Sequence, residues 1–124
     1  SIGDSCFNIA RTMNRRMSAK EDFTESQYNH IEQMFELTDD ALTQMNNLLV
    51  GHKHENDINH SFNIENEMNN YRDQLSTQNI RDVNEHKYTY AIGTMYMDII
   101  QECEKLGDYV VNVVEARMGV KQSI

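Results

Sequence analysis

Apolar residues recur every three or four positions along most of the 124-residue chain. This spacing places them on one face of an α-helix, as in helices that pack side by side in a bundle. The pattern predicts four helices, over residues 2–17, 25–50, 56–75 and 88–118. Because short connections between long helices make neighbours antiparallel, we expect an all-α, antiparallel up-and-down helix bundle.

The segment 25–50 has the clearest pattern. Its expected buried stripe alternates by three and four residues and consists of Tyr28, Ile31, Phe35, Thr38, Leu42, Met45 and Leu49. Thr24 and Gln27 have the spacing of a capping box, which satisfies backbone donors at the start of a helix. Gly51 suits the left-handed position that follows the end of a helix. The end signals and the periodicity therefore agree.

The segment 88–118 is apolar over a wider angle. One stripe consists of Ile92, Tyr96, Ile99, Cys103, Leu106, Val110 and Val113. A second stripe lies beside it and consists of Met97, Ile100, Glu104, Gly107, Val111 and Val114. A helix with so wide an apolar face packs against more than one neighbour, so we expect it at the centre of the bundle.

The other two helices have weaker patterns. Residues 2–17 predict a shorter helix that breaks at 18–21, and its expected inward residues are Ile2, Cys6, Ile9, Met13 and Met17. In 56–75, one expected stripe consists of Ile64, Met68, Tyr71 and Leu75, and the stripe beside it of Ile58, Phe62 and Glu65. Few apolar residues follow, so a turn is predicted within 76–85, although no glycine or proline marks it.

The composition fits a helical protein that does not bind nucleic acid. The chain has no proline, so nothing in its sequence interrupts a long helix. Its net charge is −9, whereas a nucleic-acid surface requires clustered lysine and arginine. The densest basic run is Arg11, Arg15, Arg16 and Lys20, which we interpret as a solvated helix face.

Two further features concern the cellular setting. Cys6 and Cys103 lie on the apolar stripes, so we expect buried free thiols in a reducing compartment. No segment reaches the ~18 consecutive apolar residues of a membrane span, and no signal peptide is visible. The chain opens with Ser1 in place of an initiator methionine, which suggests a piece of a longer protein.

One short sequence occurs twice. The segment Ile2–Ile9 (IGDSCFNI) matches Leu106–Val113 (LGDYVVNV) at an offset of 104 residues. In each copy an asparagine follows the aspartate by four residues, so the two side chains lie one turn apart on the same helix face. We interpret the chain as the tail of one repeat followed by the whole of the next.

These residues resemble the signature of the PhoU family, Glu-x-Ile-Gly-Asp-x-x-x-Asn-Ile, which lies near the end of the third helix of each repeat. The second copy is complete and consists of Glu104, Leu106, Gly107, Asp108, Asn112 and Val113. The first copy lacks its glutamate because the chain begins one residue after that position. The resemblance implies that residues 1–20 are the tail helix of a first PhoU-like repeat. Residues 21–124 would be a complete second three-helix repeat, with one compact domain overall.

The resemblance also implies a function in the regulation of phosphate transport. PhoU proteins are helical regulators of phosphate uptake at the inner face of the bacterial membrane, and a closely similar domain forms the cytoplasmic tail of bacterial sodium/phosphate cotransporters. The implied location is therefore the cytoplasmic face of the bacterial inner membrane. The implied partner is the transporter membrane domain or a phosphate-transport signalling partner, and a homodimer is a further option. The alternative is a helical oligomerisation scaffold with no bound metal or ligand.

A carboxylate pair is the candidate site. Glu104 and Asp108 are four residues apart and project from one helix face. In the PhoU family such pairs on facing helices bind multinuclear clusters of iron or zinc, and Glu65 is in register to contribute from the preceding helix. Asn69 stands where the family usually has aspartate, and an amide oxygen is a weaker ligand than a carboxylate.

Two weaker candidates and one alternative accompany this site. Asn112 extends the same ridge by one turn, and Asp4 is the counterpart of Asp108 in the first copy of the repeated sequence. The alternative is that the carboxylates pair with a basic group such as Arg72, since an inward carboxylate needs a partner.

Other site hypotheses fit less well. The run of His52, His54, Glu55, Asp57 and His60 invites a zinc interpretation, but its spacing matches no closed tetrahedral site. A di-iron enzyme needs two Glu-x-x-His motifs, and only Asp57 with His60 comes near that pattern. No nucleophile–base arrangement or phosphate-binding glycine loop stands out, so we do not expect an enzyme.

Overall fold

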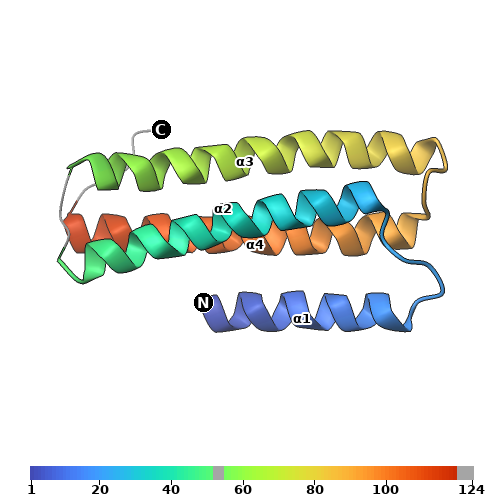
Figure 1. Cartoon of the computed structure of the whole chain (residues 1–124), viewed down its shortest axis with the longest axis horizontal. Coiled ribbons are helices and arrows are strands. Elements are labelled where there is room, and N and C mark those ends of the chain that lie inside the picture. The colour runs from blue at the N-terminus through green and yellow to red at the C-terminus, as the bar shows by residue number, and fades with distance from the viewer. Residues whose placement is uncertain (52–54, 120–124) are drawn as a thin grey trace.

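The computed structural model describes residues 1–51 and 55–119, and this part of the chain forms four α-helices and no strand. They are α1 (Ile2–Ser18), α2 (Glu25–Leu49), α3 (Glu55–Asn84) and α4 (Tyr90–Met118). The chain reverses direction at each connection, and the helices lie lengthwise beside one another (Figure 1). The predicted all-α up-and-down bundle is confirmed.

Helix α4 is the centre of the bundle, as its wide apolar face predicts. It packs against α1, α2 and α3, whereas α1 contacts no other helix than α4 within the described ranges. Both predicted stripes of α4 are buried except at Val113, which is half-buried, and the side chains of Ile99, Ile100 and Cys103 are completely inaccessible to solvent. The core therefore surrounds the middle of α4.

The ends of the helices follow their local sequence signals. Thr24 and Gln27 form the predicted capping box at the start of α2. Gly51 has φ of +102° just after the end of α2, a left-handed conformation that glycine adopts without strain. The Thr89 hydroxyl caps α4 by accepting a hydrogen bond from the backbone N–H of Ile92, at 3.3 Å.

The predicted turn within 76–85 is wrong, because α3 continues to Asn84. Two side chains in this stretch face the start of α4. Val83 packs against the core, and Asn79 accepts a hydrogen bond from the hydroxyl of Tyr88, at 2.6 Å. The turn comes after Asn84 instead, where His86 has φ of +59° and the backbone N–H of Lys87 bonds to Asp82 O.

The buried stripe of α2 is also shifted from the prediction. Ile31, Thr38 and Met45 are buried as expected, but Tyr28 and Phe35 are 36% and 41% exposed. Leu49 is exposed as well. The observed buried face consists of Gln27, Ile31, Met34, Thr38, Ala41, Met45 and Leu48. The shift arises because α3 and α4 cover this face, while α1 does not reach the other edge of the apolar stripe.

The inward residues predicted for α1 are only partly buried. Cys6 is exposed and Met17 is 69% exposed, and the buried residues of α1 are Ser5 and Thr12. The physical reason is that α1 has one neighbouring helix, so only a narrow face of it is covered. The expectation of a buried thiol therefore holds for Cys103 and is wrong for Cys6.

Among the described helices, none combines the length and the apolar character needed to cross a lipid bilayer.

Candidate carboxylate site between α3 and α4

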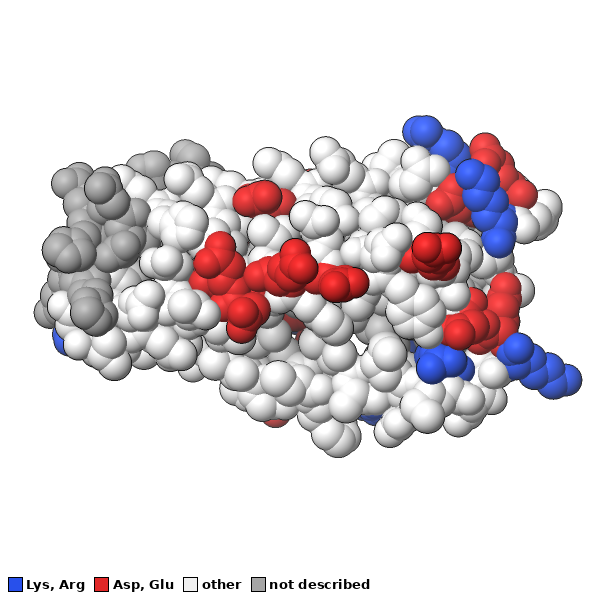
Figure 2. Space-filling view, viewed as in Figure 1, with Lys and Arg blue, Asp and Glu red and all other residues white. Residues whose placement is uncertain are grey.

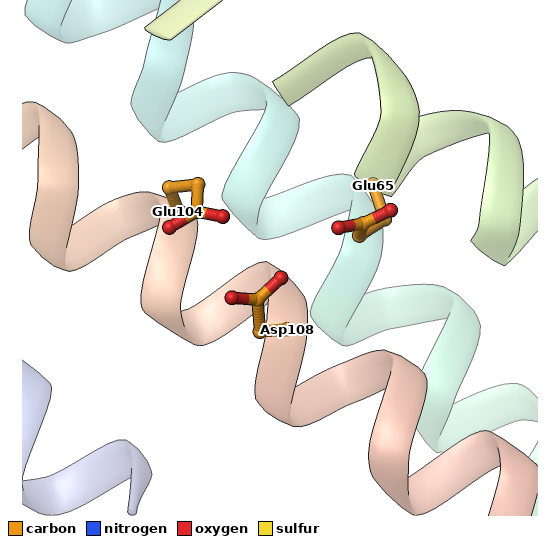
Figure 3. A group of neighbouring side chains, drawn as sticks. All are labelled: Glu65, Glu104 and Asp108. Atoms are coloured by element: carbon orange, nitrogen blue, oxygen red, sulfur yellow. The ribbon is translucent and has the colours of Figure 1, made fainter. Parts of the chain in front are cut away.

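Three carboxylates from two helices meet at the middle of the bundle. Glu104 and Asp108 stand one turn apart on α4, and Glu65 reaches toward them from α3 (Figure 3). Each residue offers an oxygen atom, and these three atoms lie within 4.8 Å of one another. The structure thus brings together the three residues that the sequence selected.

Gly107 permits the close approach of the two helices at this point. A Cβ atom at Gly107 would lie 3.0 Å from the sulfur of Met68, which is completely buried on α3. Met68 follows Glu65 by three residues, so it lies one turn further along the same helix face. The absence of a side chain at Gly107 therefore lets α3 bring the Glu65 carboxylate near Glu104 and Asp108.

Burial and mutual repulsion raise the cost of ionising this site. Glu65 and Glu104 are 8% and 9% exposed, whereas Asp108 lies at the exposed edge. Burial raises the pKa of Glu104 above its ordinary value, and the neighbouring Asp108 carboxylate raises it further. The nearby Arg72 guanidinium acts in the opposite direction. The site therefore favours a positive charge among its oxygen atoms.

Arg72 supplies one such charge. Its Nη1 lies 3.1 Å from Glu104 Oε1, and its Nη2 lies 3.0 Å from Asp73 Oδ1. The expected pairing of a site carboxylate with Arg72 is therefore present for Glu104. Of the three carboxylates in the group, Glu104 is the one that this ion pair joins to Arg72.

Asn69 supports the site in a way that sequence reasoning missed. Its Nδ2 donates a hydrogen bond to Glu65 Oε1 at 2.5 Å, which fixes the carboxylate of a residue one turn away on α3. The Asn69 Oδ1 atom is buried and has no hydrogen-bond partner among the described residues. The i, i+4 spacing of Glu65 and Asn69 was the available signal for this contact.

The donor set fits a cation that accepts oxygen ligands. Three carboxylates are the ligand type that hard divalent cations and carboxylate-bound iron use. The two weaker candidates are not gathered in the same way. Asn112 is exposed one turn beyond Asp108, and Asp4 is exposed on α1, outside this group of carboxylates.

Most of the histidine-rich run lies outside the described part of the chain. His52 and His54 lie outside the described residues, as do the side chains of Glu55 and Asp57. The remaining member, His60, has its Nε2 atom 3.7 Å from Asp40 Oδ2 on α2.

Residues 29–116 match the family model described as PhoU domain. The matched range covers most of α2, all of the described α3 and nearly all of α4, and it contains the three carboxylates of the site. No curated protein and no solved structure matches the chain.

Proposed function

The chain belongs to the PhoU domain family, and from this membership we propose that it regulates phosphate transport by binding a cation at the carboxylate site. The family consists of non-enzymatic, helical regulatory domains associated with phosphate transport. The single observation that carries the proposal is the meeting of Glu65 with Glu104 and Asp108. A cation held by these groups would offset the repulsion among the carboxylates and would tie α3 to α4.

The finer proposal is that the chain is the cytoplasmic portion of a sodium-dependent phosphate cotransporter. It is supported by the resemblance of the second sequence motif, Glu104 to Val113, to the PhoU signature, because a closely similar domain forms the cytoplasmic tail of such transporters. In this setting the domain lies at the cytoplasmic face of the bacterial inner membrane. Its partner is the membrane domain of the transporter or a phosphate-transport signalling protein.

The functional test is phosphate uptake in cells that produce the cotransporter membrane domain with or without this chain. We expect the chain to change the rate of sodium-dependent uptake of radiolabelled phosphate and to co-purify with the membrane domain. The double substitution Glu65→Gln with Glu104→Gln should abolish the change in rate while the helical circular dichroism stays the same. An uptake rate that is indifferent to the wild-type chain would contradict the proposed regulatory function.

The cation is tested separately by metal analysis and by thermal unfolding with and without a chelator. Iron and zinc are the ions to add first, because the family binds them at such carboxylate pairs. Because a ligand that binds only the folded form stabilises it, removal of the ion should lower the melting temperature. Glu104→Gln should remove this dependence, and Glu67→Gln should not, because Glu67 is exposed on α3 and outside the carboxylate group.

The second candidate function is a helical scaffold in which the carboxylates bind no ion. The ion pair between Arg72 and Glu104 favours it, because a guanidinium already neutralises part of the site. A melting temperature that is indifferent to chelator and to added iron or zinc would favour this scaffold over the cation-binding domain.

A further inference from the structure

A polar groove lies between α2 and α3, and all of its lining residues come from these two helices. Its volume is about 390 Å³, which is within the range of sites that hold ligands. Most of the lining side chains are carboxamides, namely Gln33 on α2 and Asn63, Asn66, Asn70 and Gln74 on α3. The groove therefore presents an unusual concentration of one kind of hydrogen-bonding group.

These carboxamides have no role in holding the fold together. Within the described part of the chain, none of the five makes a side-chain hydrogen bond. The four on α3 are exposed and follow one another at intervals of three or four residues, so they form a row along the helix. Asparagine is a weak helix former, so such a row does not favour the helix either. A departure from the local preference of an element is expected where side chains bind a ligand.

Two further lining residues, Leu37 and Tyr71, give the groove an apolar part. Both are half-buried and pack against the core. The Tyr71 ring also contacts the ring of His30 on α2 in an edge-on arrangement, with 6.3 Å between the ring centres. An apolar surface of this kind suits the aliphatic part of a lysine or arginine side chain, and an aromatic face also attracts the charged end.

The surroundings of the groove are acidic. Glu67 lines it, and Glu32 and Glu36 are exposed next to its two lining residues on α2. These three carboxylates have no ion-pair partner among the described residues. Acidic side chains gather in a band over the middle of the molecule, and no lysine or arginine lies within this band (Figure 2). The groove therefore attracts a positively charged ligand and repels a phosphorylated one.

The spacing of the carboxamides matches the backbone of an extended peptide. Asn66, Asn70 and Gln74 follow one another at intervals of four residues, which is about 6 Å along the helix axis. In an extended chain the N–H and C=O groups of every second residue point to the same side, with a repeat of about 6.6 Å. A carboxamide both donates and accepts hydrogen bonds, so each one can bind the C=O and the N–H of one peptide residue. Rotation of the side chains covers the small difference between the two repeats.

We propose that the groove between α2 and α3 binds an extended peptide segment of a partner protein, and that this segment contains lysine or arginine. Asn66, Asn70 and Gln74 bind the backbone of alternate peptide residues, so the affinity comes largely from the main chain, as in other complexes of extended peptides. A basic side chain of the peptide lies with its aliphatic part on Tyr71 and its charge beside Glu67. The acidic surroundings then select a basic sequence over an acidic one.

The groove is separate from the other features of the bundle. Within the described ranges α1 packs on α4 and contacts neither α2 nor α3. On the repeat interpretation, the helices equivalent to α2 and α3 would pack on α1, because Gly3 is the counterpart of Gly107, where α3 approaches α4. That packing leaves the groove between α2 and α3 open. The groove also shares no residue with the carboxylate site, so this inference does not rest on a bound cation.

The test begins with selection of random heptapeptides from a display library on the complete, immobilised chain. Enriched peptides are synthesised with a fluorescent label, and their dissociation constants are measured by anisotropy. We expect the enriched sequences to contain lysine or arginine and to lack proline at alternate positions, because proline has no backbone N–H to donate. Binding should persist in the presence of a chelator, since the groove lies outside the carboxylate site.

Variants of the groove locate the binding site. Asn66→Ala and Asn70→Ala should each weaken binding about three- to tenfold, as expected for the loss of a hydrogen bond. Both residues are exposed and alanine is the better helix former, so helical circular dichroism should be retained. Glu67→Lys should weaken binding more at low than at high salt concentration. The control Asn46→Ala removes an exposed carboxamide of α2 outside the groove and should leave the dissociation constant unchanged.

Methylation of peptide nitrogens tests recognition of the backbone. Methylation of every second N–H in one register should abolish binding, because these groups face the carboxamides, and methylation in the other register should leave binding nearly unchanged. The absence of any enriched peptide would overturn the proposal, whatever other ligand the groove takes. Peptides that bind Asn66→Ala and Asn70→Ala as tightly as the wild type would overturn it too, as would binding that is insensitive to methylation in both registers.

Discussion

Arg72 Nη1 on α3 lies 3.1 Å from Glu104 Oε1 on α4, so an ion pair joins the two helices at the edge of the carboxylate site. The side chain of Glu104 is 11% exposed and that of Arg72 is 30% exposed. Removing the Arg72 guanidinium would leave the largely buried Glu104 carboxylate beside two others. The free energy lost in this way is larger than the net contribution of the ion pair itself. A substitution of Arg72 can therefore distinguish a site that only stabilises the fold from a site that binds a cation.

Arg72→Met should lower the free energy of unfolding by about 1–3 kcal/mol in the absence of added metal, because Glu104 loses its partner. Urea unfolding of the variant and of Glu104→Gln measures the change. If the site binds a cation, Arg72→Met should also bind the added ion more tightly, since a competing positive charge is gone. A variant that is destabilised but shows no gain in ion-dependent stability would favour the scaffold.

The central position of α4 gives a stability prediction. Ile99 is completely buried at the middle of this helix, so Ile99→Asp should cost more than about 4 kcal/mol by burying an unpaired charge. Ile99→Val should lower the free energy of unfolding by about 1 kcal/mol. This milder variant still tests the burial of the position if the aspartate variant does not fold. Gln33 is exposed on α2, so Gln33→Lys should change the free energy of unfolding by less than about 0.5 kcal/mol. Similar urea midpoints for all three variants would contradict this placement.

The two thiols should react at very different rates. Cys6 is exposed on α1, so a thiol reagent should label it in the native protein. Cys103 is completely buried, and burial raises the pKa of its thiol to about 11, so it should react only after unfolding. Counting labelled thiols by mass spectrometry before and after addition of urea measures this. Rapid native labelling of both would mean that α1 leaves α4 in solution.

The thiols also show what the sequence could and could not predict. Helix type and order follow from local periodicity and capping, so the bundle and the ends of α2 were predictable. Whether an apolar position is covered depends on which neighbour lies beside it. Because α1 packs on α4 alone among the described helices, Cys6 and Phe35 are exposed although their spacing is that of core residues.

In the candidate site, too, the features set by local spacing were predictable and those set by individual side-chain contacts were not. The i, i+4 spacing of Glu104 and Asp108 fixes their common face, and a buried Glu65 was expected from its position on the partly apolar face of α3. The bond from Asn69 to Glu65 was not predicted, because it depends on the rotamers of two polar side chains. The late end of α3 was missed because the contact of Asn79 with Tyr88 and the packing of Val83 against the core do not show in the periodicity of α3 itself.

Acidification should destabilise the fold through His30. Its Nδ1 lies 2.9 Å from the hydroxyl oxygen of the buried Tyr96, and burial lowers the pKa of His30, although Asp82 opposes this. Because the pKa in the folded chain is below the value in the unfolded chain, near 6.5, the unfolded chain takes up the proton first. The stabilisation is complete above that pH and is lost as the pH falls from it through the lower pKa of His30 in the folded chain.

The measurement is urea unfolding at pH 7.5 and 5.5 for the wild type and His30→Gln. Glutamine retains a hydrogen-bonding group and does not titrate, so the variant should lose less stability on acidification than the wild type. Equal losses in both proteins would show that His30 does not contribute to the pH dependence in this range.

The two glycines of the repeated sequence should respond in opposite ways to alanine. Alanine favours a helix over glycine, and nothing lies within 4 Å of a Cβ at Gly3, so Gly3→Ala should raise the free energy of unfolding by about 0.5 kcal/mol. At Gly107 the same Cβ would lie 3.0 Å from the sulfur of Met68. Because Met68 is completely buried, its displacement should exceed the gain in helix propensity, so Gly107→Ala should destabilise the chain. Thermal unfolding of both variants at low micromolar concentration compares them, and a gain at Gly107 equal to that at Gly3 would show that α3 does not pack closely on α4 beside the carboxylate site.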